Sequence, residues 1–309
     1  MPTIRPTREE DLPFLADLLD GIFRRSRGIM DQSMLTDFPL VFAPANWRNG
    51  RVVYQDDRLV AHAALWRREA VINGERLVIG VLVSVATHPD YRQRGYAAEA
   101  VMSLQAQMYE EEYDLGLLWT GVPDFYRKLN WEPVERRGAT IVLQPARLAQ
   151  EWPADVAIAR FDPQHAKAVY EMHERESIRF LRSPQESRTL LDLPKIDTWM
   201  ATRAGQVVGY LVHATGCNKR GLIEYGGELD AIVTLACHVT RRQPASTELP
   251  LLAYHVRPAL IDWAQKLGLP LAPLHSSKGF GHEMILRVRR DRISTYHCTQ
   301  LFAWGLDQA

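Results

Sequence analysis

The stretch that decides the fold is VLVSVATHPDYRQRGYAAEAVMSLQAQM, residues 81–108. It begins with an apolar, β-branched run over residues 81–85, which predicts a buried strand. Pro89 prevents that strand from continuing, and a basic segment that contains Gly95 follows directly. Apolar residues then recur at the spacing of one helical face, at Ala97, Val101, Leu104 and Met108. The pattern therefore predicts a buried strand, a basic glycine turn and an amphipathic helix in succession.

This succession favours an anion-binding site at the start of the helix. The first backbone N–H groups of a helix lack intrahelical partners, and the helix dipole favours negative charge there. Gly95 lets a ligand approach the backbone closely, while Arg92 and Arg94 supply positive charge. The turn is not a P-loop, because no Gly-Lys-Ser/Thr follows, and it lacks the GxGxxG of dinucleotide-binding folds. An ordinary strand-to-helix turn with solvated arginines is the structural alternative.

Length and composition exclude several classes of protein. A chain of 309 residues corresponds to about two domains. Lys plus Arg and Asp plus Glu are both 37, which argues against a dedicated nucleic-acid binder. The three cysteines, Cys217, Cys237 and Cys298, are too widely spaced for a disulfide framework or a metal motif. Without a signal-peptide core or an apolar run of roughly 18 residues, we expect a cytoplasmic protein with no metal and no membrane partner.

The rest of the first half reads as a sheet built around the central strand. Strands are expected over residues 51–55, 59–68 and 70–72, and Asn73-Gly74 is a strong hairpin signal that leads into the central strand. After the central helix, Leu115–Thr120 is a further apolar strand. A short helix with Phe125 and Tyr126 follows, and Thr140–Leu143 is expected to close the first sheet.

The second half repeats the order of the first half with little identity. Residues 151–154 read as a linker, and the matching segments are 158–163, 198–202, 207–213, 221–225, 229–239, 249–255 and 257–267, with a final strand at Gln300–Trp304. Where the first half has its basic loop, the second has Gly226-Gly227-Glu228-Leu229-Asp230. Two carboxylates at a helix start would repel a pyrophosphate. The second half is therefore expected to be a degenerate copy that lacks the anion-binding site.

Two motifs resemble those of the GNAT-type N-acetyltransferases. The loop Arg92-x-x-Gly95-x-Ala97 after His88-Pro89 resembles their pyrophosphate loop, and Phe-Tyr-x-x-Leu-x-aromatic-x-Pro from Phe125 resembles the end of their catalytic domain. The tandem order, with FPLVFAPANWRNGRVV followed by VAHAAL, is most similar to two-domain proteins related to the enhanced-intracellular-survival acetyltransferases, without their long sterol-carrier-like domain. The resemblance implies an α/β (α+β) fold of two tandem GNAT-like domains, residues 1–150 and 151–309. Each would be a mixed, mostly antiparallel sheet flanked by helices, and the second would be degenerate.

The resemblance also implies an activity: transfer of the acetyl group of acetyl-CoA to a primary amine by direct attack, through a tetrahedral intermediate. The amine would belong to a small molecule or to a peptide or protein. Tyr126 is the expected general acid, and His88 is interpreted as a structural loop residue. The expected acetyl-CoA-binding residues are Val85, Ala86, Thr87, Arg92, Gln93, Arg94, Gly95, Tyr96 and Ala97. The alternative is a non-catalytic acyl-CoA-binding regulatory protein, and a nucleic-acid-modifying transferase is disfavoured by the neutral charge balance.

The sequence leaves the general base open. A lysine-like amine has a pKa of about 10.4, so it must lose a proton before it attacks. Ser84 lies near the strand position where some family members have a glutamate, and a serine cannot act as that base. Asp37, Glu224, the Ala309 carboxylate and a water chain are the alternatives. The pattern predicts neither the identity of the acceptor amine nor the oligomeric state, nor whether the second domain contacts the substrate.

Overall fold

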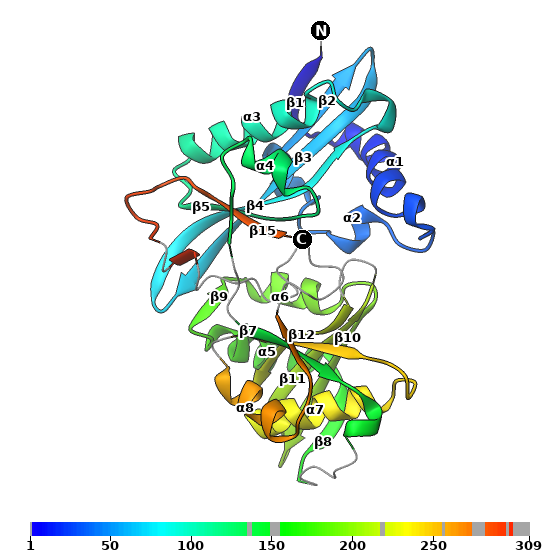
Figure 1. Ribbon diagram of the computed structural model, residues 1–309, viewed down its shortest axis with the longest axis vertical. Helices are drawn as coiled ribbons and strands as arrows, with labels where there is room; N and C mark the ends of the chain where they lie inside the picture. The colour runs from blue at the N-terminus through cyan, green and yellow to red at the C-terminus, as the bar shows by residue number, and fades with distance from the viewer. Residues whose placement is uncertain are drawn as a thin grey trace.

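A computed structural model describes residues 2–134, 138–148, 155–216, 220–254, 257–273, 282–294 and 297–298 (Figure 1). Two sheet-and-helix bodies lie one after the other along the long axis of the molecule. The α-helices of the described residues are α1 (Leu12–Phe23), α2 (Met34–Asp37), α3 (Tyr96–Glu110), α4 (Pro123–Arg127), α5 (Ala166–Glu174), α6 (Pro184–Leu191), α7 (Leu229–Arg241) and α8 (Pro258–Lys266). The mixed α/β class expected from the sequence is confirmed, with helices flanking both sheets.

The first sheet is antiparallel except at its centre. Its strand order is β1 (Thr3–Pro6), β2 (Gly50–Gln55), β3 (Arg58–Ile72), β4 (Glu75–Thr87), β5 (Leu115–Thr120), β15 (His282–Arg287) and β6 (Glu132–Pro133), and β9 (Ile178–Phe180) also pairs with β3. The predicted hairpin joins β3 to β4, with positive φ angles of 49° at Asn73 and 93° at Gly74. Only β4 and β5 are parallel in this sheet, within the part of the chain that the structure describes.

The helices cover the two faces of the first sheet. The α3 residues Val101, Leu104 and Met108 are fully buried and pack with Val53 and Leu65, as the helical spacing predicted. Ala97, the first residue of the predicted face, is only half-buried, and Ala100 is buried in its place. On the opposite face, α1 buries Leu15, Leu18 and Leu19. The central strand is therefore covered on both sides, which explains why its sequence is an almost continuous apolar run.

The second sheet repeats the order of the first, as the internal echo predicted. Its strands lie in the order β14 (Leu271–Pro273), β7 (Gly138–Leu143), β13 (Leu249–Tyr254), β12 (Arg220–Gly227), β11 (Gln206–Thr215), β10 (Ile196–Arg203) and β8 (Ala157–Arg160). β12 and β13 are parallel, and α7 follows β12 as α3 follows β4. The structure thus contains two versions of the same strand-and-helix plan.

The expectation that residues 140–143 close the first sheet is wrong. β7 pairs instead with β13 and β14 of the second sheet, and β15 takes the place beside β5 in the first sheet (Figure 1). Both strands are short and apolar, so nothing in their own composition says which sheet they join. Each sheet therefore includes a strand from the opposite half of the chain.

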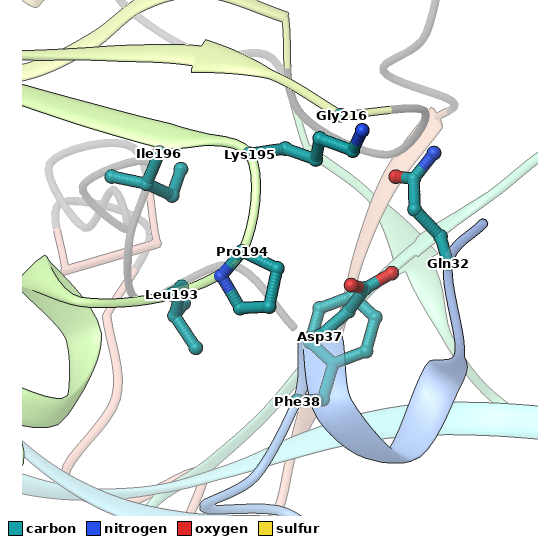
Figure 2. Close-up of a pocket in the computed structure, with 8 residues that line it drawn as sticks. All are labelled: Gln32, Asp37, Phe38, Leu193, Pro194, Lys195, Ile196 and Gly216. Carbon is teal, nitrogen blue, oxygen red and sulfur yellow. The ribbon is translucent and has the colours of Figure 1, made fainter.

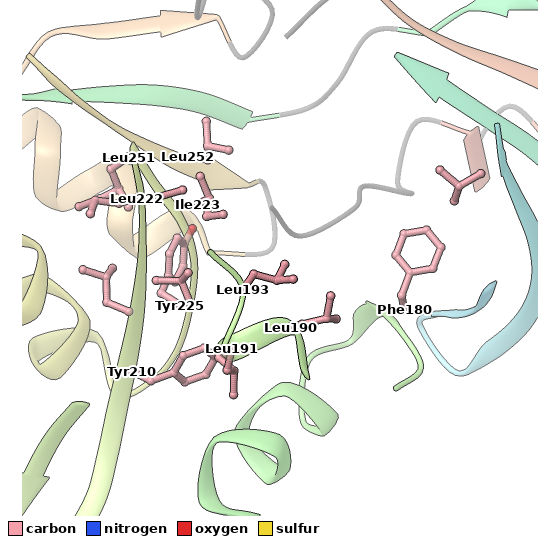
Figure 3. Packing of buried hydrophobic residues seen from close by; sticks show 14 of the residues in the cluster. Phe180, Leu190, Leu191, Leu193, Tyr210, Leu222, Ile223, Tyr225, Leu251 and Leu252 are labelled. Atoms are coloured by element: carbon pink, nitrogen blue, oxygen red, sulfur yellow. The ribbon is translucent and has the colours of Figure 1, made fainter. Parts of the chain in front are cut away.

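A shared core joins the two bodies. β9 extends the first sheet from beyond residue 150, with Phe180 opposite Ala70, and Phe180 is fully buried. Figure 3 shows Leu190, Leu191 and Leu193 between Phe180 and the second sheet. One contiguous cluster of buried apolar residues therefore runs from the α1 face of the first sheet into the second.

Several sequence predictions lie outside the described residues. These are the linker at 151–154, Cys217, the final strand Gln300–Trp304 and the Ala309 carboxylate. Among the described helices, none has the length and apolar character that crossing a membrane requires.

Candidate active site

The central parallel pair separates at one point in the first sheet. β4 and β5 pair at Ile79–Leu115, Gly80–Gly116 and Val81–Leu117, and β4 then continues to Thr87 without β5. The other edge of β5 is occupied by β15 along its whole length. The β4 backbone after Val81 therefore has no ladder partner on its β5 side among the described residues, and this unpaired stretch is called the opening below. The predicted ligand residues Val85, Ala86 and Thr87 lie along this opening.

A β-bulge interrupts β4 at the same place. The register against β3 shifts between His62 and Ala64, and Ser84 adopts a φ angle of 53°. A bulge adds one residue to one strand and turns the following residues relative to the ladder. The residues that follow Ser84 are those that line the opening.

The basic loop ends in a helix start that has no side-chain cap. Gly95 is the N-cap of α3, with a φ angle of 85°, and within the described residues no side-chain cap bonds to the first turn. A Cβ added at Gly95 would meet only Glu99, at 3.8 Å, so the space in front of the helix is open. The predicted combination of a glycine turn and an exposed helix start is thus present in the structure.

The arginines of the loop are exposed and held by carbonyl oxygens. Arg92 Nε lies 3.4 Å from the Thr87 oxygen, and Arg94 Nη2 lies 3.2 Å from the Asp90 oxygen. Neither guanidinium forms an ion pair with a carboxylate in the described part of the chain. Their charge is therefore available to an anion. Gln93, between them, is also exposed and has a φ angle of 62°.

The side chain of Tyr96 does not face the loop surface. It is buried, and its hydroxyl donates to Gln55 Oε1 over 3.3 Å. Ala97 is half-buried in the first turn of α3. At these two positions the backbone, rather than the side chain, faces the uncapped helix start.

The sequence did not single out Arg58, which the fold brings to the same loop. Arg58 Nη2 lies 2.7 Å from His88 Nε2, and its guanidinium lies over the Tyr91 ring at 5.6 Å. His88 Nδ1 accepts from the Asp90 N–H over 3.3 Å at the start of a 3₁₀ turn, Pro89–Tyr91. This agrees with the structural role expected for His88. One sequence signal could have found Arg58. The Asp56-Asp57 turn sets the start of β3 at Arg58, and in the antiparallel pair the start of β3 lies beside the end of β4.

Tyr126 lies in α4, directly after β5. It is 6% exposed and packs edge-on against Phe125 and Trp131, with ring centroids 4.8 and 6.3 Å away. Burial raises the pKa of the Tyr126 phenol well above its ordinary value of 10. The hydroxyl is therefore fully protonated at neutral pH, as a proton donor must be.

Two of the proposed general bases are already engaged with arginines. Asp37 Oδ2 accepts from Arg24 Nη2 over 2.5 Å, and the Arg24 side chain is fully buried. Glu224 is fully buried on β12, where both of its oxygens accept from Arg182, over 2.9 and 2.8 Å. Both carboxylates are therefore already occupied by an arginine and do not offer an unengaged acceptor for the proton of an attacking amine.

A cavity lies where the two halves meet. It is lined by Gln32, Asp37, Phe38, Leu193, Pro194, Lys195, Ile196 and Gly216 (Figure 2). Beside it, Lys195 Nζ donates to Asp31 Oδ2 over 2.7 Å and links the second half to the first. The segment after α1, with Gln32, Asp37 and Phe38, thus forms one wall of this cavity.

The comparisons with known proteins agree with this geometry. Residues 3–134 match the family described as acetyltransferase (GNAT) domain. A GCN5-related N-acetyltransferase from Anabaena variabilis has a similar structure, with a TM-score of 0.69 and 13% identity over 94% of this chain and 73% of that one. A probable N-acyltransferase from Enterococcus faecalis gives a TM-score of 0.72 and 13% identity over 93% and 73%.

A third similar structure is Eis1 from Mycobacterium abscessus, with a TM-score of 0.61 and 14% identity over 93% of this chain and 74% of that one. No curated protein sequence matches this chain. At such low identity these structures show a common fold and nothing about the substrate. Residues 3–134 therefore belong to the GNAT acetyltransferase domains, in a chain whose overall fold is that of the GCN5-related N-acetyltransferases.

Proposed function

We propose that the chain binds acetyl-CoA in its first half and transfers the acetyl group to a primary amine of a small molecule, a peptide or a protein. One observation carries this proposal. The opening between β4 and β5 lies directly before an uncapped helix start with two exposed arginines. A long ligand with an anionic middle and an uncharged arm fits that arrangement.

In this proposal the loop binds the diphosphate. The first-turn N–H groups of α3, at Tyr96 and Ala97, donate to its oxygens, and Arg92 and Arg94 neutralise its charge. Gln93 and Gly95 give the loop the left-handed turns that point its backbone at the ligand. The exposed edge of β4, residues 85–87, then pairs with the pantetheine amide and polarises the thioester carbonyl.

Tyr126 completes the reaction as the general acid. The amine nitrogen attacks the carbonyl carbon, a C–N bond forms and the C–S bond breaks. The departing thiolate takes the phenolic proton of Tyr126. A positioned acid of this kind contributes roughly 10²- to 10⁴-fold to the rate. The high pKa of the buried phenol keeps that proton in place until the thiolate develops.

The proton of the attacking amine needs a separate acceptor. Because Asp37 and Glu224 are bound to arginines, we assign this role to a water chain. The same observation favours a second candidate function, an acyl-CoA-binding regulatory protein without turnover. Binding without acetyl transfer would identify that alternative.

We propose the cavity at the junction as the approach for the acceptor amine. Its walls come from the segment after α1 and from residues 193–196 of the second half. The second half would then act as a wall of the acceptor site without binding CoA itself. Leu193 and Lys195 are the positions at which this part of the proposal can be tested.

The deciding experiment is an acetyl-CoA turnover assay over a panel of primary amines, which includes aminoglycosides, polyamines and lysine peptides. We expect thiol release that depends on one class of amine, with the acetylated amine identified by mass spectrometry. Arg76→Glu, an exposed arginine at the far end of β4, serves as the charge-matched control for Arg94→Glu. CoA binding with no acetylated product from any amine would contradict the enzyme assignment.

A further inference from the structure

His62 is a buried histidine on β3 beside the proposed site. Its side chain is 1% exposed, and its ring lies 6.1 Å from that of Phe42. Its Nδ1 is 3.0 Å from the carbonyl oxygen of Ser84. A carbonyl can only accept, so Nδ1 carries the hydrogen and donates it to the Ser84 oxygen.

The partner of this hydrogen bond is the residue that forms the bulge in β4. Ser84 has a left-handed backbone, with a φ angle of 53°, which is strained for any residue other than glycine. The bulge shifts the register between β3 and β4, so the Ser84 carbonyl is removed from the regular ladder. His62 supplies a donor for that carbonyl and stabilises the strained conformation.

The bulge lies between the end of the β4–β5 pairing and the residues that face the opening. The last paired residue of β4 is Val81, and residues 85–87 follow Ser84 directly. Their orientation toward the opening depends on the turn that the bulge introduces. We propose that His62 is a positioning residue that holds the Ser84 bulge and so aims the N–H groups of residues 85–87 at the thioester carbonyl. This inference rests on the proposed acetyl transfer.

His62 acts here as a neutral donor. Burial lowers the pKa of its imidazole to about 4, so the ring carries no charge at neutral pH. A neutral ring with its hydrogen on Nδ1 is a fixed donor, not a proton acceptor for the substrate amine. The pH dependence of kcat above pH 6 should therefore be the same with and without His62, even where kcat itself differs.

Three substitutions separate the hydrogen bond from the volume of the ring. His62→Asn places an amide N–H near the position of Nδ1, His62→Gln places one near Nε2, and His62→Leu removes the donor. The matched control is His213→Leu, because His213 is likewise buried but lies on β11 in the second sheet, outside the loop and the opening. Steady-state kcat and KM for acetyl-CoA are measured, with CoA affinity by calorimetry.

We expect kcat to fall by about tenfold or more in His62→Leu and His62→Gln, with the CoA dissociation constant within about threefold of wild type. His62→Asn should recover kcat to within about threefold of wild type, and His213→Leu should match wild type. If kcat follows side-chain size instead, so that Gln exceeds Asn, the hydrogen bond has no role and the inference is overturned. The Asn and Gln pair decides the matter even if His62→Leu does not fold.

Amide hydrogen exchange over residues 81–87 tests the inference without any turnover. Faster exchange in His62→Leu and His62→Gln, with wild-type exchange in His62→Asn, supports the clamp on the bulge. Equal exchange in all four proteins overturns it. A wild-type protein that binds CoA and acetylates no amine would instead contradict the proposed function, while the exchange result still decides on His62.

Discussion

The starts of α3 and α7 occupy the same place in the two halves, and they differ in charge and in access. α3 begins after Gly95, with the exposed guanidinium groups of Arg92 and Arg94 and no cap. α7 begins after Glu228, and Arg203 bonds there to Glu228, to Asp230 Oδ2 over 2.6 Å and to Asp155 Oδ2 over 2.8 Å. The first helix start is open to an anion, whereas the second is closed by the chain's own ion pairs.

Glycine is required near the starts of α3 and α7 for different physical reasons. A Cβ at Gly95 would make only an ordinary contact with Glu99, at 3.8 Å, so this glycine serves the left-handed turn and access to the backbone. A Cβ at Gly227 would lie 2.2 Å from the Val208 oxygen, and one at Gly209 would lie 2.8 Å from Ala231. Gly227 therefore lets the end of β12 approach the β11 backbone closely, and Gly209 lets α7 pack closely on β11. A glycine turn before a helix does not by itself indicate a ligand site.

The helices that follow β5 and β13 show the same divergence. α4 and α8 both begin with proline, after N-cap residues of nearly equal backbone angles, at Val122 and Arg257. Tyr126 corresponds to Ile261, counted from these prolines. Arg257 donates to the Gly227 oxygen over 3.2 Å and pairs with Glu176. At the described position that matches Tyr126 the second half therefore has an isoleucine, and Arg257 ties the start of α8 to Gly227 and Glu176.

The largest expected effect concerns the proton donor. Tyr126→Phe should lower kcat by roughly 10²- to 10⁴-fold and leave the CoA dissociation constant nearly unchanged. Tyr113→Phe is the control, because Tyr113 is also buried and its pKa is also raised by burial. Because burial raises the pKa of Tyr126, no loss of kcat through its ionisation is expected at pH 10. Wild-type kcat in Tyr126→Phe, with chemistry rate-limiting, would assign Tyr126 to packing.

The next largest expected effect concerns the stability of the second half and its buried pair of Arg182 and Glu224. Glu224→Gln leaves Arg182 buried without its charged partner, which should lower the free energy of unfolding by about 3 to 5 kcal/mol. Urea unfolding followed by circular dichroism measures this loss. Arg203→Ala, which breaks exposed ion pairs, should cost much less. Equal losses in the two variants would show that burial does not distinguish the two clusters.

The loop should respond to charge and to volume. Arg94→Glu and Gly95→Trp are each expected to weaken CoA binding by about 100-fold, because they reverse a charge or block the helix start. Circular dichroism should show wild-type folding in both variants, since both positions are exposed. Calorimetric titration measures the affinity, with Arg76→Glu as the control. Wild-type affinity in both loop variants would refute the assignment of the loop.

The last prediction concerns the number of CoA molecules that one chain binds. One chain should bind one CoA, and Arg203→Ala should not create a second site, because Glu228 and Asp230 remain at the start of α7. Bound CoA should stabilise the protein by about 2.7 kcal/mol at roughly a hundredfold excess over the dissociation constant. Calorimetry gives the stoichiometry and thermal unfolding gives the stabilisation. Two CoA per chain would show that the second half has kept its site.

Short stretches of sequence specify several features of this fold. The strand, turn and helix around Gly95 follow from proline, glycine and apolar spacing, all within residues 81–108, and the hairpin follows from Asn73-Gly74. The loss of the loop in the second half is readable from Glu228 and Asp230 alone. Such features depend on neighbours in the chain, so a single sequence contains the information that specifies them.

Tertiary structure decided the rest. The exchange of β7 and β15 depends on which sheet edge is open after the other strands have paired. The residues of such a short strand do not specify which of the two sheets it joins. The pairs His62–Ser84 and Arg182–Glu224 join residues that are 22 and 42 positions apart. The sequence offered Glu224 only as one alternative for the general base and did not single out His62, because burial and partners arise only when distant strands and loops meet. That is why the loop around Gly95 could be predicted from the sequence, while the pairs His62–Ser84 and Arg182–Glu224 could not.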